Sequence, residues 1–392
     1  MNIAYHNSHK IKVAIIDDGF DWHTSKKFHN AHTYFYEVKN GKIKKQRGIY
    51  HIYLSSHGTR CLAIYANTVK NLSPYDIYCI KALKPNTRYS SIDDLETALL
   101  WCLNNNISII SISLGTTYYK DYDRLRDIVQ RLISNGTIIV AAHSNENLLS
   151  FPASFSSVIG VRCDYANELL QEEQYILLQK NLSNIDIISS CKYSNLNSVL
   201  DDEIDNYNSY ATPYIAALVH KGVINGYNSL SKALYYLDLN KTKINNFCFW
   251  KYLKPILKIS NEVTIPVVGI ISIPSKKYMH DVMESLASYF RKDDYNASII
   301  CDYSTDDDRS FNKDTLHTFG LDSLYEMSKF IAYYTQANLL LVEVSMLYNN
   351  IDYSYFDLLL GEKSNVDISL PYICIKNQSP EQIYEKIKEI FT

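Results

Sequence analysis

Four side chains in the N-terminal part of the chain have the types that acyl transfer requires. In chain order they are Asp17, His57, Asn145 and Ser209. A serine hydroxyl attacks a carbonyl carbon well when a histidine takes its proton and a carboxylate orients that histidine. An amide can donate a hydrogen bond to the oxyanion that the attack creates. The sequence therefore predicts a nucleophilic serine site, provided that the fold brings these residues together.

The predicted nucleophile lies just ahead of a predicted helix. Ser209 is followed by Ala211–Pro213 and by the apolar segment Tyr214–Val219. Free backbone N–H groups and the helix dipole at a helix start favour negative charge, which suits a nucleophilic serine. A serine in this place is more often only an N-cap, so this segment alone leaves both interpretations open.

The other candidate residues follow predicted strands. The apolar segment Lys12–Ile16 predicts a buried strand that ends at Asp17, and Thr137–Ala142 predicts another that ends before Asn145. Catalytic groups collect at the carboxyl ends of strands in α/β sheets. An aspartate or asparagine after a strand is also an ordinary turn residue, and that alternative stays open here.

Helical and strand patterns alternate through this region. Segments 61–66, 92–105 and 124–134 predict helices, and 78–83 and 107–115 predict strands. Such alternation predicts a doubly wound, mostly parallel α/β sheet.

The segment at 24–50 interrupts this alternation. It is polar, aromatic and basic, and we expect a loop there with a possible hairpin around Asn40 and Gly41.

Five segments, taken in order, resemble the sequence blocks of the subtilisin-like serine peptidases, the S8 subtilases. They correspond to the aspartate, histidine, substrate-binding, oxyanion and nucleophile blocks of that family: Lys12–Gly19, His57–Thr59, Ser111–Gly115, Ala141–Glu146 and Ser209–Pro213. The resemblance implies a subtilisin-like fold for the first part of the chain.

The resemblance also implies a catalytic role for each of the four residues. Asp17 would orient His57, His57 would act as general base and then general acid, and Ser209 would be the nucleophile. The side-chain amide of Asn145, together with the Ser209 backbone N–H, would hold the oxyanion.

A substrate groove follows from the same resemblance. An extended peptide would pair as an added strand with Ser113–Gly115. The residues expected to bind it are Ser113, Leu114, Gly115, His143 and Ser144. A cis bond is expected between Phe151 and Pro152.

The chain departs from the family pattern near the site. Tyr207 and Asn208 replace the usual Gly-Thr, His143 is bulky where the family has a small residue, and Tyr210 and Tyr214 flank Ala-Thr-Pro in the nucleophile block. Because the catalytic groups remain, these changes favour narrow specificity. A catalytically inactive relative that only binds peptides is the alternative.

Composition argues against several other classes. With 46% hydrophobic and 21% charged residues the chain has the composition of a globular protein, and no apolar segment is long enough to span a bilayer. A net charge of −3 gives no reason to expect nucleic acid or a membrane as partner. Eight cysteines without a C-x-x-C pair predict buried thiols of a reducing compartment and not a disulfide frame or metal site, so we expect the cytoplasm. We expect no cofactor, and the sequence leaves open whether any metal ion is bound.

A second domain is predicted after the peptidase domain. We expect a subtilisin-like domain at 1–239, a linker at 240–262 and a smaller α/β domain at 263–392. In that domain Gly269–Tyr278, between a strand and a helix, resembles a degenerate P-loop, and Glu343 a degenerate Walker B residue.

That degenerate loop lacks the chemistry of an intact one. Ser275 replaces the second glycine, Tyr278 replaces the hydroxyl residue that binds magnesium, and Lys276 is then an ordinary surface lysine. We expect a domain that docks a peptide or partner and hydrolyses no nucleotide. A peptidase regulated by nucleotide is the alternative.

The sequence therefore predicts a cytoplasmic serine endopeptidase. Its predicted substrate is a specific precursor peptide, because the layout, with no prosegment expected, resembles that of subtilases that remove leader sequences from ribosomally made peptides. The sequence leaves the oligomeric state open.

Overall fold

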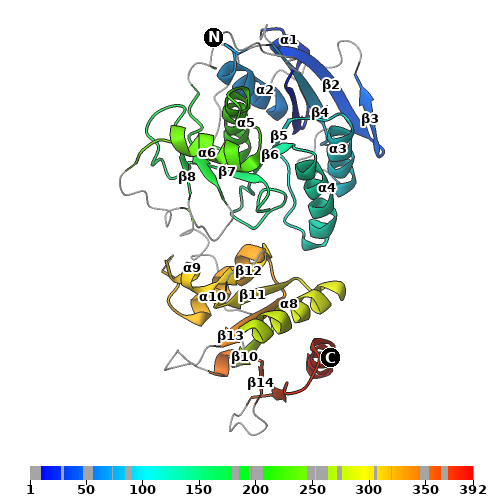
Figure 1. Cartoon of the computed structure of the whole chain (residues 1–392), viewed down its shortest axis with the longest axis vertical. Helices are drawn as coiled ribbons and strands as arrows, with labels where there is room; N and C mark the ends of the chain where they lie inside the picture. The colour runs from blue at the N-terminus through cyan, green and yellow to red at the C-terminus, as the bar shows by residue number, and fades with distance from the viewer. Residues whose placement is uncertain are drawn as a thin grey trace, which may run out of the picture. The chain divides into compact units, whose positions relative to one another are not determined.

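The computed structural model describes residues 10–27, 31–46, 56–72, 74–83, 91–178, 185–193, 196, 206–244, 252, 264–271, 276–303, 307–318, 320–344, 353–362 and 370–391. The chain forms two compact units (Figure 1). One comprises Met1–Glu146 and Ser150–Cys248, and the other Asn147–Leu149 and Phe249–Thr392. The predicted limits 1–239 and 263–392 stay a prediction, and most of the predicted linker lies outside the described residues.

The first unit is built on a nine-stranded sheet with the order β3-β2-β4-β1-β5-β6-β7-β9-β8. Its strands are β1 Lys12–Asp17, β2 Ala31–Lys39, β3 Lys42–Lys45, β4 Tyr75–Lys81, β5 Ile109–Ile112, β6 Ile138–Ala142, β7 Ile159–Cys163, β8 Tyr175–Leu177 and β9 Ile187–Ser189. Among the strands that the structure describes, only the two edge pairs, β2–β3 and β8–β9, are antiparallel. The predicted doubly wound, mostly parallel α/β fold is confirmed.

Helices cover both faces of this sheet (Figure 1). They are α1 Trp22–Ser25, α2 His57–Thr68, α3 Ile92–Asn104, the 3-10 turn η1 Tyr119–Asp121, α4 Tyr122–Ser134, α5 Asn208–Ile224 and α6 Leu230–Asn240. Val13 and Ile15 of β1 share a core with α2, α5 and α6, while the intervening Ala14 and Ile16 are equally buried. Since strand side chains alternate between faces, both faces of β1 are covered, as its continuous apolar sequence requires.

Three predicted boundaries need correction. Segment Ala31–Lys39, expected to be loop, is strand β2, because its half-buried residues pair in parallel with β4 even though they show no apolar alternation. Strand β5 ends at Ile112 and does not extend to Gly115. Helix α5 begins at Asn208, so Ser209 lies inside its first turn.

The predicted hairpin between β2 and β3 is confirmed. Its two central residues, Asn40 and Gly41, have φ of 53° and 65°. Both lie in the left-handed region that a tight hairpin turn of this kind demands, which asparagine and glycine tolerate best.

The second unit contains six parallel strands in the order β12-β11-β13-β10-β14-β15. Its elements are β10 Val267–Ile271, α8 Lys276–Lys292, β11 Ala297–Cys301, β12 Ser310–Asn312, α9 Lys313–Thr318, α10 Leu324–Thr335, β13 Leu339–Val344, the 3-10 turn η3 Tyr353–Tyr355, β14 Leu358–Gly361, β15 Tyr372–Cys374 and α11 Pro380–Phe391. Strands β12 and β14, which are only three and four residues long, were not expected from the sequence.

Glu343, the residue that resembles a Walker B glutamate, is engaged by hydrogen bonds within the second unit. The Glu343 carboxylate accepts a hydrogen bond from the Asp302 backbone N–H at 2.8 Å. The fully buried Lys313 Nζ donates to the Glu343 carbonyl and pairs with Asp302 Oδ1 at 3.0 Å. These contacts fasten β11, β12 and β13 together at one end. The loop at 272–275, where the degenerate P-loop was expected, lies outside the described residues.

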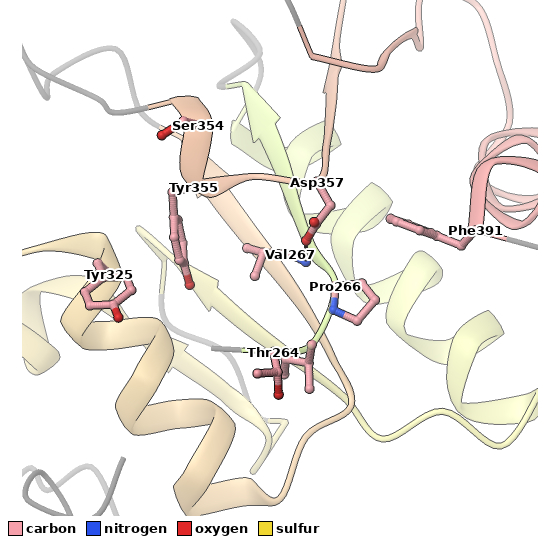
Figure 2. Close-up of a pocket in the computed structure, with 9 residues that line it drawn as sticks. Thr264, Pro266, Val267, Tyr325, Ser354, Tyr355, Asp357 and Phe391 are labelled. Carbon is pink, nitrogen blue, oxygen red and sulfur yellow. Dashed lines mark hydrogen bonds between the residues drawn. The ribbon is translucent and has the colours of Figure 1, made fainter. Parts of the chain in front are cut away.

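A pocket of about 590 Å³ lies at the amino ends of the strands of this sheet, where β10 and β14 begin (Figure 2). Its lining residues are Thr264, Ile265, Pro266, Val267, Tyr325, Ser354, Tyr355, Asp357 and Phe391. Asp357 Oδ2 already accepts the Val267 N–H at 2.8 Å, so this carboxylate ties the two strands together. Ligands of doubly wound sheets bind at the carboxyl ends of strands, and this pocket lies at the amino ends.

Along the described part of the chain, every helix is too short or too polar to cross a lipid bilayer.

Helices α2 and α5 are joined by a buried hydrogen bond. Tyr65 on α2 and Nδ1 of His220 on α5 lie 2.7 Å apart, and both side chains are almost fully buried. Burial lowers the pKa of His220 to about 4. The folded protein therefore holds His220 neutral, while the unfolded chain has a histidine of ordinary pKa near 6.5.

This shift predicts a loss of stability in acid. The contribution of neutral His220 to the free energy of unfolding is complete above pH 6.5 and is lost as the pH falls toward 4. The loss at pH 4 amounts to about 3 kcal/mol. In urea unfolding at pH 7 and pH 4, His220→Gln should lose about 3 kcal/mol less than wild type between the two pH values. Glutamine keeps an oxygen acceptor for the Tyr65 hydroxyl but does not titrate. Equal losses in the two proteins would contradict this account.

Candidate active site

The carboxyl ends of three neighbouring strands meet at one edge of the nine-stranded sheet. Asp17 is the last residue of β1, Ser113 follows β5, and His143 follows β6. Strand β1 lies between β4 and β5, so the chain winds to one side of β1 and then returns to the other. That reversal is where α/β sheets bind ligands.

The start of α2 places His57 over this edge. Ser56 caps the helix by accepting the Thr59 N–H at 3.3 Å. The Asp18 carboxylate accepts the backbone N–H groups of His57 at 3.3 Å and of Gly58 at 2.9 Å. A negative charge at a helix N-terminus is stabilising, and here it fixes the residue that carries the imidazole.

Gly58 is required by a close backbone approach. A Cβ at this position would lie 2.3 Å from the carbonyl oxygen of Gly19 and 2.9 Å from the Asp17 Cβ. A glycine here lets the end of β1 approach α2 closely. Any larger residue would push α2 away from the end of β1.

Helix α5 carries Ser209 in its first turn, buried to 7% exposure. Pro213 lies inside this helix and has no N–H, so the carbonyl of residue 209, four residues earlier, loses its helical donor. The Cys61 thiol donates to that carbonyl at 3.5 Å. The thiol thus satisfies a buried acceptor that the proline leaves open.

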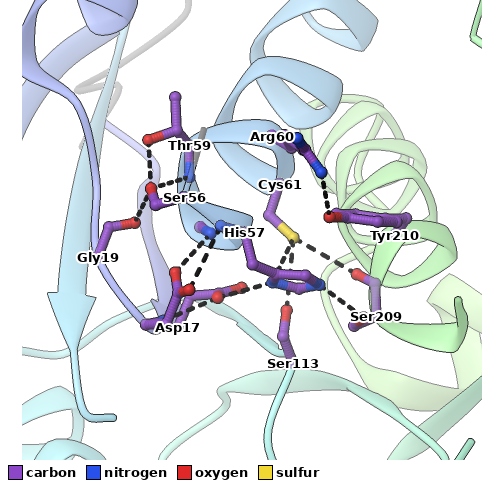
Figure 3. A network of polar contacts seen from close by, with 12 residues as sticks. Asp17, Gly19, Ser56, His57, Thr59, Arg60, Cys61, Ser113, Ser209 and Tyr210 are labelled. Atoms are coloured by element: carbon purple, nitrogen blue, oxygen red, sulfur yellow. Dashed lines mark hydrogen bonds and ion pairs between the residues drawn. The ribbon is translucent and has the colours of Figure 1, made fainter. Parts of the chain in front are cut away.

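Asp17, His57 and Ser209 lie in line (Figure 3). The distance from His57 Nδ1 to Asp17 Oδ1 is 2.7 Å, and the distance from His57 Nε2 to Ser209 Oγ is also 2.7 Å. The structure therefore brings these three predicted residues together. An imidazole held between a carboxylate and a hydroxyl can accept the hydroxyl proton at one nitrogen while the other donates to the carboxylate.

The two ionisable groups stabilise each other's charged forms. Burial raises the pKa of Asp17, but the charge and hydrogen bond of His57 outweigh it, so that pKa lies below the ordinary 3.8. Burial lowers the pKa of His57, but the charge and hydrogen bond of Asp17 together with the contacts of Cys61 outweigh it, so that pKa lies well above 6.5. Opposite charges in a desolvated site shift both groups in this way.

Cys61 lies beside the imidazole without being a nucleophile. Its sulfur lies 3.6 Å from His57 Nδ1 and 3.6 Å from Ser113 Oγ. Burial raises the pKa of Cys61 to about 12, so the thiol stays protonated. Among the described residues, ligand atoms of Asp17, His57 and Cys61 lie within 4.8 Å of one another. Their mutual hydrogen bonds account for that closeness, and we assign no metal to them.

Asn145 follows β6 and is held by the start of α5. Its Oδ1 accepts the Asn208 backbone N–H at 3.0 Å, and its side chain is exposed. Because the oxygen is engaged, the amide NH₂ is the group left to donate. The structure thus ties the predicted oxyanion donor to the residue directly before Ser209.

The side chain of Asn208 clamps the same region. Its Nδ2 donates to the carbonyls of His143 and Ser144, both at 3.0 Å. Its Oδ1 accepts the Cys163 N–H at 2.9 Å. Asn208 therefore links α5 to the ends of β6 and β7. In the sequence Asn208 stands out only as a departure from the family pattern. Its hydrogen bonds depend on β6 and β7, which only the fold brings beside it.

The predicted substrate-binding residues lie along two segments at this edge. Ser113 and Leu114 are half-buried, Gly115 is exposed, Ser144 is half-buried, and His143 is only 2% exposed. Just beyond Gly115, Thr116 forms an antiparallel bridge with Phe151. The expected cis bond between Phe151 and Pro152 is confirmed. The binding roles of these residues stay a prediction.

Known proteins provide an independent comparison. The family model described as Peptidase S8, subtilase family, matches residues 8–233, which is more than half of the chain. No curated protein matches the sequence.

Several solved structures are similar in fold. A lanthipeptide protease has a TM-score of 0.41 and 14% identity over 64% of this chain and 79% of its own. The epidermin leader peptide processing serine protease from Staphylococcus aureus has a TM-score of 0.42 and 17% identity over 62% and 72%. A prenylagaramide maturation protease has a TM-score of 0.35 and 17% identity over 66% and 86%.

The clamp formed by Asn208 predicts a large effect on stability. Asn208→Ala would remove the three hydrogen bonds that its side chain makes to the ends of β6 and β7, which should cost about 2–4 kcal/mol in urea unfolding. The matched control is Asn225→Ala at the other end of α5, where the amide makes one exposed bond to the Lys221 carbonyl. That control should cost less than about 1 kcal/mol. Equal losses of unfolding free energy in the two variants would mean that the hydrogen bonds of Asn208 stabilise the protein no more than one exposed bond does.

Proposed function

The chain belongs to the subtilase family of serine endopeptidases, and we propose that its catalytic triad is Asp17, His57 and Ser209. The observation that carries this proposal is the pair of 2.7 Å hydrogen bonds on the two nitrogens of one imidazole. The position of Ser209 in the first turn of α5 supports it, because developing negative charge is favoured there.

The proposed reaction proceeds through an acyl-enzyme. Ser209 Oγ bonds to the carbonyl carbon of the peptide while its proton passes to His57 Nε2. The imidazolium then donates that proton to the leaving amine as the C–N bond breaks. Water attacks the acyl carbon, again giving its proton to His57, and the proton returns to Ser209 as the acid product leaves. Asp17 stabilises the imidazolium in both halves.

We assign Asn145 to the oxyanion, together with the Ser209 backbone N–H. The engagement of Asn145 Oδ1 by Asn208 supports this role, because it leaves the amide NH₂ as the donor. Donors fixed in advance cost no reorganisation when the charge develops.

For the substrate, we propose a specific precursor peptide that lies as an added strand along Ser113–Gly115. The bulky side chains of Tyr207 and Tyr210 beside the nucleophile support a narrow choice of substrate, because large neighbours restrict what can approach. We further propose that the protein works in the cytoplasm. The seven cysteines that the structure describes are all free thiols, as a reducing compartment favours.

Labelling with a fluorophosphonate probe tests the proposed triad directly. The phosphorus of the probe bonds to the serine oxygen and fluoride leaves, so labelling requires an activated hydroxyl. Wild type should be labelled, and Ser209→Ala and His57→Ala should not. Ser113→Ala, which removes another hydroxyl at the same edge, should still be labelled. A folded wild-type protein that resists the probe, or labelling that survives Ser209→Ala, would overturn the proposal.

Removal of the oxyanion amide should slow catalysis without unfolding the protein. For Asn145→Ala we expect a loss of about 10²–10³ in kcat on a cleaved peptide, the size known for the corresponding asparagine of a subtilisin. Asn147→Ala, two residues further along the same loop, is the control. A kcat within threefold of wild type for Asn145→Ala would remove this residue from the oxyanion site.

The charge state of the imidazole should govern the pH dependence. Since the reaction needs neutral His57 and Asp17 holds the pKa of His57 well above 6.5, the labelling rate should rise with pH and reach half its plateau above pH 6.5. Asp17→Asn should move this midpoint to lower pH and lower the plateau. A midpoint below 6.5 in wild type would contradict the assigned ion pair.

A further inference from the structure

The side chain that follows the nucleophile covers one face of the imidazole. The ring of Tyr210 stacks on His57 with centroids 4.4 Å apart and an interplanar angle of 21°. Tyr210 is buried, with 3% of its surface exposed, whereas its neighbour Tyr207 is 41% exposed. Tyr210 is therefore a wall of the site.

Tyr210 is held at two points. Arg60 Nη1 donates to its side-chain hydroxyl at 3.2 Å, and the hydroxyl of Tyr193 donates to its backbone carbonyl at 3.0 Å. Arg60 lies three residues after His57 on α2, one helical turn along (Figure 3). The helix that carries the imidazole thus also holds the ring that covers it.

This arrangement supplies a constraint that the triad hydrogen bonds lack. The bonds from His57 to Asp17 and Ser209 lie along the line that joins its two nitrogens, so they resist tilting of the ring about that line only weakly. A ring stacked on the imidazole face resists the tilt, because tilting would drive the two faces together.

The stack also has an electrostatic consequence. The face of a phenol ring carries negative potential and attracts a cation, most strongly where water is excluded. His57 becomes a cation when it takes the Ser209 proton. The charged and titratable groups around it are Asp17 and Asp18 from the end of β1, Arg60 and Cys61 from α2, and Tyr210 from α5.

We propose that Tyr210 is a positioning residue for the proposed catalytic base: its ring, stacked on the imidazole, fixes the plane of His57 and stabilises the imidazolium. This inference rests on the proposed function, since it assigns a role to the partner of the base. A residue that only filled space beside Tyr207 would contribute to stability and leave the titration of His57 unchanged.

The test uses the pH dependence of fluorophosphonate labelling in the full chain, from pH 5 to pH 9.5. Tyr210→Leu removes the ring, and we expect labelling about 3- to 30-fold slower at its plateau with a lower midpoint pH. Tyr210→Phe keeps the stack and loses only the Arg60 contact, so it should stay within about threefold of wild type with an unchanged midpoint. Tyr210→Met, which fills similar space without a ring, should behave like Tyr210→Leu, so failure of one variant to fold leaves the other.

A matched control separates the stack from general packing. Tyr214 lies one turn further along α5, is equally buried, and its ring packs on Tyr175 and Tyr193. Tyr214→Leu should lower the thermal midpoint of unfolding as Tyr210→Leu does, yet keep the wild-type pH profile. A wild-type rate and profile in Tyr210→Leu, or in Tyr210→Met, would overturn the inference. So would a Tyr210→Phe protein as impaired as Tyr210→Leu, because the hydroxyl and not the ring would then matter.

The outcomes of the two proposals are distinct. If wild type is not labelled at all, the proposed triad fails. If wild type is labelled and the Tyr210 variants match it, only the role of Tyr210 fails.

Discussion

The packing of α2 against α5 is the constraint on which the site depends. One helix carries His57 and the other Ser209, and their N-termini must meet over the end of β1 for a 2.7 Å hydrogen bond to form. Gly58 permits the approach, the Cys61 thiol bridges from α2 to the carbonyl of Ser209, and Tyr65 and His220 join the helices further along. A shift of an ångström between the helices would break these contacts together, since packed interfaces do not deform smoothly.

Much of the fold and of the site could be predicted because each catalytic candidate lies where a local pattern changes. Asp17 ends an apolar strand, His57 and Ser209 begin helices, and Asn145 follows the strand at Ile138–Ala142. The rest depends on partners far away in the chain. Strand β2 lacks alternation and is specified by its pairing with β4, and the clamp of Asn208 exists only once β6 and β7 lie beside α5.

Burial and neighbouring charges together set the pKa values of the two carboxyl groups at the end of β1. Asp17 is fully buried yet ionised, because His57 supplies a compensating charge. Asp18, next to it, has a raised pKa because burial and the Asp17 charge outweigh the two helix N–H groups that it accepts. The pKa values of two adjacent carboxyl groups are thus shifted in opposite directions by their different partners.

The order of the elements along the chain has a consequence for synthesis. Ser209 follows His57 by 152 residues, and α5, buried on nearly all sides, packs against strands that must already be paired. Segments distant in sequence close slowly, and a chain emerging from the ribosome folds from its N-terminus. Ser209, the proposed nucleophile, is therefore the last part of the candidate site to arrive, after the strands and helices that position it.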